Sequence, residues 1–296
     1  MRKSLLAFAA WIAGLLPGPF RTGLYRVPGL APLLRRMLNR AAPQGLSEVR
    51  IAAGGLAGYT LQLDLQTEKD YWLGTYEPEL EQAAGRLVPP GAVVYDVGAN
   101  IGYTALLLAK AAGQGGRVYA FEALPDNLAR LQRNVALNGM TDRIRVVPAA
   151  VTQATGPVRF LVHASGGMGK VEGSAGRTDE TYPSELLVEG LSLDDFVFGQ
   201  GNPPPQVIKM DIEGGEVLAL PGMRRVLQEA RPRLLMELHG PESARAAWEA
   251  LGAAGYEISW MRPGFPAVPS LQALGWKAYI IARPQSAAPA GSAEAR

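Results

Sequence analysis

The chain has 296 residues, of which 48% are hydrophobic and 19% are charged, so it can bury a core of its own. Its formal net charge at pH 7 is only +2, which argues against a protein that binds nucleic acid. Cysteine is absent, which excludes disulfide bonds, thiolate nucleophiles and cysteine-bound metals; we expect a cytoplasmic protein.

Residues 1–45 are predicted to form an N-terminal helical extension. A charged start and the apolar residues 4–16 resemble a signal peptide, but this run is shorter than the ~20 residues that span a bilayer, and no small-residue cleavage site follows. Arginines then alternate with leucine and proline: Arg21, Arg26, Arg35, Arg36 and Arg40. Three interpretations stay open: a helix packed on the core or on a homodimer partner, a peripheral membrane contact through residues 1–40, and a cleaved signal.

Residues 46–91 lead into the core. Two β-prone runs, 49–51 and 59–65, flank Gly54-Gly55 and predict a small hairpin, with a helix after it.

The core is expected over residues 92–283, where strand and helix patterns alternate. The strand candidates are 93–96, 118–122, 144–147, 158–162, 207–211, 234–238, 258–260 and 277–282. The helix candidates are 103–112, 125–138, 217–230 and 242–254. This alternation predicts an α/β fold, a mostly parallel sheet with helices on both faces and a late antiparallel edge. Residues 284–296 are rich in alanine, proline and serine and are expected to form a disordered tail.

A glycine loop at residues 96–102 follows the first strand of this core. The strand ends in Asp96, and Gly98 and Gly102 then remove side chains where the chain turns sharply into a helix. A dinucleotide fingerprint needs glycine at position 100, which is Asn100, so a diphosphate is not the expected ligand. Asp96 suits the amino group of an amino-acid-like ligand, and Glu122, at the end of the next strand, suits the hydroxyls of an adenosine ribose. Together they favour S-adenosylmethionine.

The chain resembles the FkbM family of class I, S-adenosylmethionine-dependent methyltransferases. The matching segments, in order from about residue 70 to 283, are Tyr76-Glu77-Pro78, 96–102, Phe121-Glu122-Ala123, Asn134 with Asn138, Leu193-Asp194-Asp195, 208–216, and Glu237 with His239. The resemblance implies a doubly wound, mostly parallel seven-stranded sheet with helices on both faces. It also implies that Glu77 folds over the cofactor. The alternative is that Glu77 is a carboxylate on the protein surface. The expected cofactor-binding residues are Glu77, Asp96, Gly98, Asn100, Gly102 and Glu122.

Polar residues at the ends of two later strands are the candidates for catalysis. Alternation along 207–211 turns Lys209 and Asp211 to one face, and Glu237 and His239 share a face on the next strand. An aliphatic hydroxyl must lose a proton before it accepts a methyl group. We favour His239 as the base, because its unperturbed pKa of ~6.5 suits neutral pH. Asp211 then orients the histidine or the acceptor, and Lys209 anchors an acceptor oxygen.

Two alternatives accompany this assignment. Asp211, Glu213, Glu237 and His239 are also metal-ligand types, but they come from two strands rather than from one compact motif, so we expect no metal. Glu216 is expected at a helix start. The family resemblance implies O-methylation of a hydroxyl on a small molecule or glycan: a saccharide, a lipid-linked sugar or a secondary metabolite. The other possibility is a catalytically silent protein that binds S-adenosylmethionine as a structural or regulatory ligand.

Overall fold

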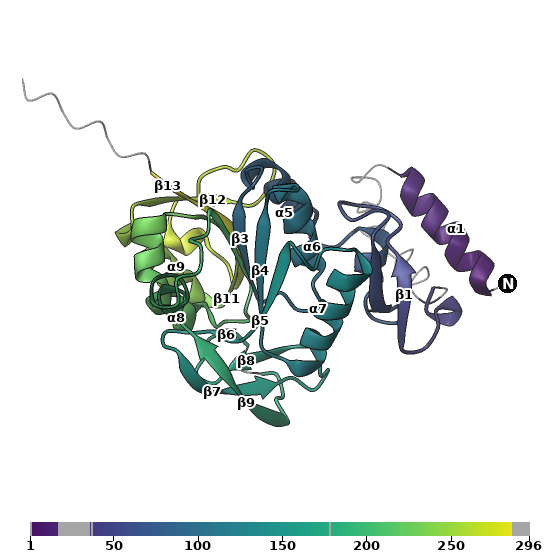
Figure 1. Cartoon of the computed structure of the whole chain (residues 1–296), viewed down its shortest axis with the longest axis horizontal. Coiled ribbons are helices and arrows are strands. Elements are labelled where there is room, and N and C mark those ends of the chain that lie inside the picture. The colour runs from purple at the N-terminus through teal and green to yellow at the C-terminus, as the bar shows by residue number, and fades with distance from the viewer. Residues whose placement is uncertain (1, 17–35, 37, 178, 286–296) are drawn as a thin grey trace, which may run out of the picture. The chain divides into compact units, whose positions relative to one another are not determined.

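The computed structural model describes residues 2–16, 36, 38–177 and 179–285 (Figure 1). The chain divides into two compact units, Met1–Pro148 and Ala149–Arg296, here called unit 1 and unit 2. Much of the arginine-rich segment and nearly all of the expected tail lie outside the described residues. The domain boundaries expected from the sequence remain predictions.

Unit 1 begins with α1 (Arg2–Leu15), which confirms a helix in the N-terminal extension. Two of its side chains, Trp11 and Leu15, are exposed. None of the described helices has the length and apolar character needed to cross a membrane. The lead-in hairpin is confirmed as β1 (Leu46–Arg50) paired antiparallel with β2 (Thr60–Asp64), and α4 (Lys69–Leu73) and α5 (Pro78–Leu87) follow.

The core of unit 1 consists of three parallel strands, β3 (Val93–Val97), β4 (Arg117–Glu122) and β5 (Ile144–Pro148). Their residues are largely buried, as expected for strands of a parallel sheet. The connecting helices are α6 (Tyr103–Ala112) and α7 (Pro125–Leu137), which lie beside these strands in Figure 1. Both begin and end within one residue of the expected positions.

Unit 2 contains four further strands of the α/β core. β10 (Val207–Met210) and β11 (Arg233–His239) are parallel, whereas β13 (Lys277–Pro284) runs antiparallel to both β11 and β12 (Tyr256–Trp260). The helix α9 (Pro241–Ala253) contacts β11 and β12. Seven core strands are thus present over the two units, and their directions are mixed, with the expected late antiparallel strands.

One sequence expectation for unit 2 was wrong, and one helix differs from the expected regular form. Residues 158–162 do not join the parallel core: β7 (Gly156–Val162) lies in a separate sheet with β6 (Ala150–Val151), β9 (Ser184–Leu191) and β8 (Gly169–Val171). Its antiparallel neighbours need only short connections, so no helix marks them in the sequence. The expected helix 217–230 is confirmed as a helical segment that begins one residue earlier, but its type changes along the chain: α8 (Glu216–Ala219), a 3-10 turn at Leu220–Met223 and a π-helical turn at Val226–Ala230. Pro221, which lacks an amide hydrogen, lies where the α-helical pattern stops.

Candidate functional site

The glycine loop of unit 1 connects β3 with α6 through several left-handed backbone positions. Gly98, Asn100 and Gly102 have φ angles of 80°, 49° and 90°. A Cβ atom at Gly102 would lie 2.5 Å from Leu131 Cδ1, so this position also requires a close approach. Asp96 lies under the loop: it is fully buried, and its Oδ2 accepts a hydrogen bond of 2.7 Å from Thr104 Oγ1. This environment gives Asp96 a supporting role in the loop, and its contact with the cofactor stays a prediction.

Glu122 joins the loop to the end of β4. Its Oε2 accepts a hydrogen bond from the Asn100 amide at 2.9 Å, and its Oε1 accepts from the amides of Ala123 and Leu124 at 3.0 and 2.8 Å. Burial raises the pKa of Glu122, although these amide hydrogen bonds work in the opposite direction. The carboxylate therefore holds the left-handed turn at Asn100 in place, a role that the sequence analysis did not assign to it.

The segment that carries Glu77 reaches the same loop through aromatic contacts. Glu77 precedes α5 with a φ of 40°, a strained conformation for a residue before proline. Its neighbour Tyr76 packs against Tyr71, with ring centroids 4.3 Å apart, and against Tyr103 at 5.6 Å. Tyr103 is the first residue of α6, directly after Gly102. Glu77 is half-buried, and its contact with the cofactor stays a prediction.

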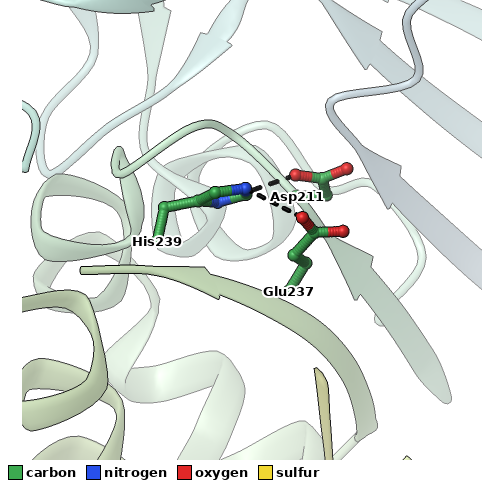
Figure 2. A group of neighbouring side chains, drawn as sticks. All are labelled: Asp211, Glu237 and His239. Carbon is green, nitrogen blue, oxygen red and sulfur yellow. Dashed lines mark ion pairs between the residues drawn. The ribbon is translucent and has the colours of Figure 1, made fainter. Parts of the chain in front are cut away.

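The structure brings Asp211, Glu237 and His239 of unit 2 together, as the sequence predicts (Figure 2). The parallel register of β10 and β11 pairs Met210 with Met236, so Asp211 and Glu237 come next at the same end of the two strands. His239 Nε2 lies 2.9 Å from Glu237 Oε1, and its Nδ1 lies 3.9 Å from Asp211 Oδ1. In Figure 2 the imidazole points toward both carboxylates.

Two further carboxylates surround this histidine. Glu213 Oε2 lies 3.6 Å from His239 Nε2, and Glu216 Oε1 lies 3.8 Å from Nδ1. Glu216 begins α8, as expected, but it is fully buried and accepts a hydrogen bond from Ser243 Oγ at 2.8 Å. We call Asp211, Glu213, Glu216, Glu237 and His239 the acidic cluster.

The carboxylates of the acidic cluster change the protonation state of His239. Burial lowers the pKa of His239, but contacts with Glu216 and Glu237 and the charges of Asp211 and Glu213 outweigh it and raise the pKa to about 10. Near neutral pH the imidazole therefore holds a proton. The reason for preferring His239 as the base, its unperturbed pKa, does not apply here, and its catalytic role stays a prediction.

Two lysines compensate part of the negative charge. Lys209 is buried, and its Nζ lies 3.9 Å from Asp211 Oδ2. Lys277 forms an ion pair with Glu237 and was missed in the sequence analysis. Burial raises the pKa of Glu237, but the contacts with His239 and Lys277 outweigh it and lower the pKa overall. A signal for Lys277 existed: it begins an antiparallel strand, whose first residues pair with the last residues of β11.

An exposed aromatic residue beside the cluster was also missed as a functional candidate. Trp276 is 43% exposed, and its ring centroid lies 6.3 Å from that of His239 in a T-shaped arrangement. The amide of Gly240 donates a hydrogen bond of 2.6 Å to the Trp276 carbonyl, which fixes the backbone there. The guanidinium of Arg177, which also pairs with Glu180, lies 5.3 Å from the Trp276 ring centroid. No motif in the sequence connects these residues, because the contacts join separate loops.

Several of the candidate site residues have strained backbone conformations. Among the described residues, five non-glycine residues have positive φ angles, and three of them are the candidate residues Glu77, Asn100 and Glu213. Such conformations persist where the surrounding structure enforces them, which is common at binding sites. Three of these five strained positions therefore lie in segments that the sequence motifs also identify.

The strand, glycine loop and helix of unit 1 have the form expected of an α/β protein that binds a small polar cofactor. The family model described as the methyltransferase FkbM domain matches residues 96–258, more than half of the chain. The chain therefore belongs to the FkbM family of methyltransferases. Its cofactor is S-adenosylmethionine, as the sequence predicts.

Three known proteins to which the chain is similar are methyltransferases by name. The hexuronic acid methyltransferase AglP of Haloferax volcanii is 29% identical over 192 residues, covering 62% of this chain and 72% of AglP. The FkbM methyltransferase structure from Methylobacillus flagellatus KT is 20% identical with a TM-score of 0.42, covering 74% of this chain and 53% of that one. An O-methyltransferase of Bacillus cereus is 15% identical with a TM-score of 0.43, covering 70% and 79%. The match thus spans about half the length of the Methylobacillus chain.

Proposed function

We propose that this methyltransferase transfers the methyl group of S-adenosylmethionine to a hydroxyl oxygen of a saccharide that carries a carboxylate, such as a uronic acid. The proposal depends above all on the arrangement in unit 2, where the acidic cluster around the buried His239 adjoins an exposed tryptophan and an exposed arginine. The similarity to a hexuronic acid methyltransferase supports the same substrate class.

For the cofactor, we propose that the glycine loop binds the amino-acid end and that Glu122 binds the ribose. Glu122 Oε2 accepts a backbone hydrogen bond from Asn100, and a carboxylate oxygen has room for a further donor. Asp96 and Asn100 shape the loop, Gly98 and Gly102 let the ligand approach the backbone, and Glu77 closes over it.

For the chemistry, we propose that Asp211 takes the proton of the acceptor hydroxyl. The protonated His239 donates a hydrogen bond to an acceptor oxygen, and Lys209 holds the carboxylate of Asp211 in position. General-base help of this kind contributes ~100- to 10,000-fold. Alignment of the oxygen with the sulfonium methyl at about 3 Å contributes the larger part of the rate.

For the acceptor, we propose that Trp276 and Arg177 bind a sugar ring and its carboxylate. An exposed indole offers a flat apolar face for the C–H groups of a pyranose, and a guanidinium offers two parallel donors to a carboxylate. Arg177 is 56% exposed at its side chain, so an acceptor can reach it from solvent.

The test is methyl transfer to matched sugars, read by mass spectrometry as the gain of one methyl group. We expect uronic-acid oligosaccharides to be methylated with a higher kcat/KM than the corresponding neutral oligosaccharides. Arg177→Gln should reduce kcat/KM for the uronic acid by about tenfold or more, the value of a charge-assisted hydrogen bond, and should leave the neutral sugar nearly unchanged.

Arg159→Gln is the matched control. Arg159 is a comparably exposed arginine on β7 that pairs with Glu172 and Glu185, so its loss should affect both sugars equally little. Methylation of a non-carbohydrate acceptor in preference to every sugar would overturn the substrate class. Tight binding of S-adenosylmethionine with no methyl transfer to any acceptor would favour the silent, regulatory alternative.

A further inference from the structure

We propose that Asp211, Glu237 and His239 form a binding site for a divalent transition-metal cation. From the sequence we expect no metal, because the ligands come from two strands. The parallel pairing of β10 and β11 removes that objection, since one ligand atom from each residue lies within 4.8 Å of the others (Figure 2). The proposal deepens the proposed function by placing an ion where that function has the proton of His239, and it depends on the proposed function only for its catalytic consequence.

The distances suit ligands that share one ion. Two atoms that each lie about 2.1 Å from a metal are about 3 to 4 Å apart, depending on the angle between them. The separation of His239 Nδ1 and Asp211 Oδ1 is 3.9 Å, and that of His239 Nε2 and Glu237 Oε1 is 2.9 Å. Asp211 faces Nδ1 and Glu237 faces Nε2, and one ligand atom from each of the three residues lies within 4.8 Å of the other two.

One buried atom of the cluster has an unused hydrogen-bonding position. His239 is only 3% exposed, and its Nδ1 has no hydrogen-bond partner among the described atoms. The carboxylates nearest to Nδ1, those of Asp211 and Glu216, lie 3.9 and 3.8 Å away, beyond hydrogen-bonding distance. A buried imidazole nitrogen that faces carboxylates across such a gap is an available metal ligand.

The charge of the cluster also favours a cation. Four carboxylates, those of Asp211 and of three glutamates, surround the imidazole, and two lysines, Lys209 and Lys277, pair with them. When an ion replaces the proton of His239, the four carboxylates and two lysines leave two negative charges, and a divalent ion compensates both. Imidazole suits first-row transition metals better than magnesium or calcium, and carboxylates suit manganese.

Three protein ligands leave coordination positions open for the acceptor. Two neighbouring oxygens of a sugar, or a hydroxyl and a carboxylate, can occupy them and be oriented by the ion. The exposed ring of Trp276 lies next to His239. The ion would thus act as part of the acceptor site.

The experiment titrates the full, EDTA-treated chain with Mn²⁺ alone and counts the remaining free ion by EPR. We expect one tight site, with a ¹⁴N coupling in pulsed EPR that reports an imidazole ligand. His239→Ala should remove this coupling and weaken binding at least tenfold, and Glu237→Gln should weaken binding to a similar extent. Circular dichroism checks that each variant is folded.

Two controls make the result specific. His163→Ala removes the other histidine of the chain, which also contacts a carboxylate, Glu180, and Glu229→Gln removes an exposed glutamate that pairs with Arg225. Both should bind Mn²⁺ like the wild type. No stoichiometric binding of Mn²⁺ or Zn²⁺ by the wild type, or binding without the nitrogen coupling, would overturn the proposal.

Methyl transfer is measured separately, so the two proposals fail independently. Sugar methylation at full rate by a chain that binds no metal contradicts the cation site alone. Metal binding with the nitrogen coupling, together with methylation of non-carbohydrate acceptors only, contradicts the substrate class alone.

Discussion

Replacing Glu122 by alanine tests whether this residue holds the glycine loop as well as the cofactor. The carboxylate accepts three backbone hydrogen bonds, from Asn100, Ala123 and Leu124, and all three amides lose their acceptor in Glu122→Ala. The turn at Asn100 has a left-handed φ of 49°, which needs external support. We therefore expect losses of both stability and cofactor affinity.

The expected loss of stability in Glu122→Ala depends on how deeply the three amides are buried. Ala123 and Leu124 are buried, so water does not replace the lost acceptor there, whereas Asn100 is half-buried and can be hydrated. An unsatisfied buried amide costs ~1–3 kcal/mol, so the two together cost ~2–6 kcal/mol. Removing a carboxylate whose pKa is raised by burial offsets part of this loss. We expect the free energy of unfolding to fall by about 2–4 kcal/mol.

Denaturant unfolding measures the stability, and calorimetry with S-adenosylmethionine measures the affinity, which should fall at least tenfold. Glu79→Ala, a substitution at an exposed glutamate of α5, is the matched control and should change neither value appreciably. A loss of stability below about 1 kcal/mol in Glu122→Ala would refute the role in the loop. Unchanged affinity would refute the contact with the ribose.

Three further predictions use the same purified chain. Burial raises the pKa of Glu122 above 4.5, and hydrogen bonds from the ribose hydroxyls favour its charged form. Cofactor affinity, measured by calorimetry, should therefore be constant at pH values above the raised pKa and weaker below it. In Glu122→Gln the affinity should no longer depend on pH in this range. Gly214→Ala should lower the free energy of unfolding by ~1–3 kcal/mol, because φ is +96° and the new Cβ would lie 2.3 Å from the Ala175 carbonyl oxygen; denaturant titration measures this. Asp211→Asn should reduce turnover ~100-fold, with cofactor affinity unchanged by calorimetry.

The parts of the fold that the sequence predicts well are those governed by local patterns. The helix α7 begins at Pro125 and ends before Gly139, which follows from proline's fixed φ and glycine's left-handed conformation. The four-stranded sheet of unit 2 was not predicted, because β9 is mostly exposed and has no clear alternation of apolar and polar residues. Its pairing with β7 is set by tertiary contacts rather than by local preference.

In the candidate site, too, the residues governed by local patterns could be predicted and those brought together by tertiary contacts could not. Asp211, Glu237 and His239 could be predicted because strand ends and side-chain alternation place them at one edge. Lys277 begins the expected late antiparallel strand, but the sequence does not show that this strand pairs with β11, because the pairing spans a long connection. Trp276 and Arg177 required the arrangement of loops, for which the sequence contains no periodic signal.

The chemistry of His239 depends on its neighbours more than on its residue type. From the sequence, a histidine at a strand end is a suitable base, because its unperturbed pKa lies near neutrality. In the structure the surrounding carboxylates raise its pKa to about 10, so it is a proton donor near pH 7. The same carboxylates make its site attractive to a cation, which would displace that proton. Whether a proton or a metal ion occupies the acidic cluster therefore decides how the acceptor is activated, and the Mn²⁺ titration distinguishes the two cases.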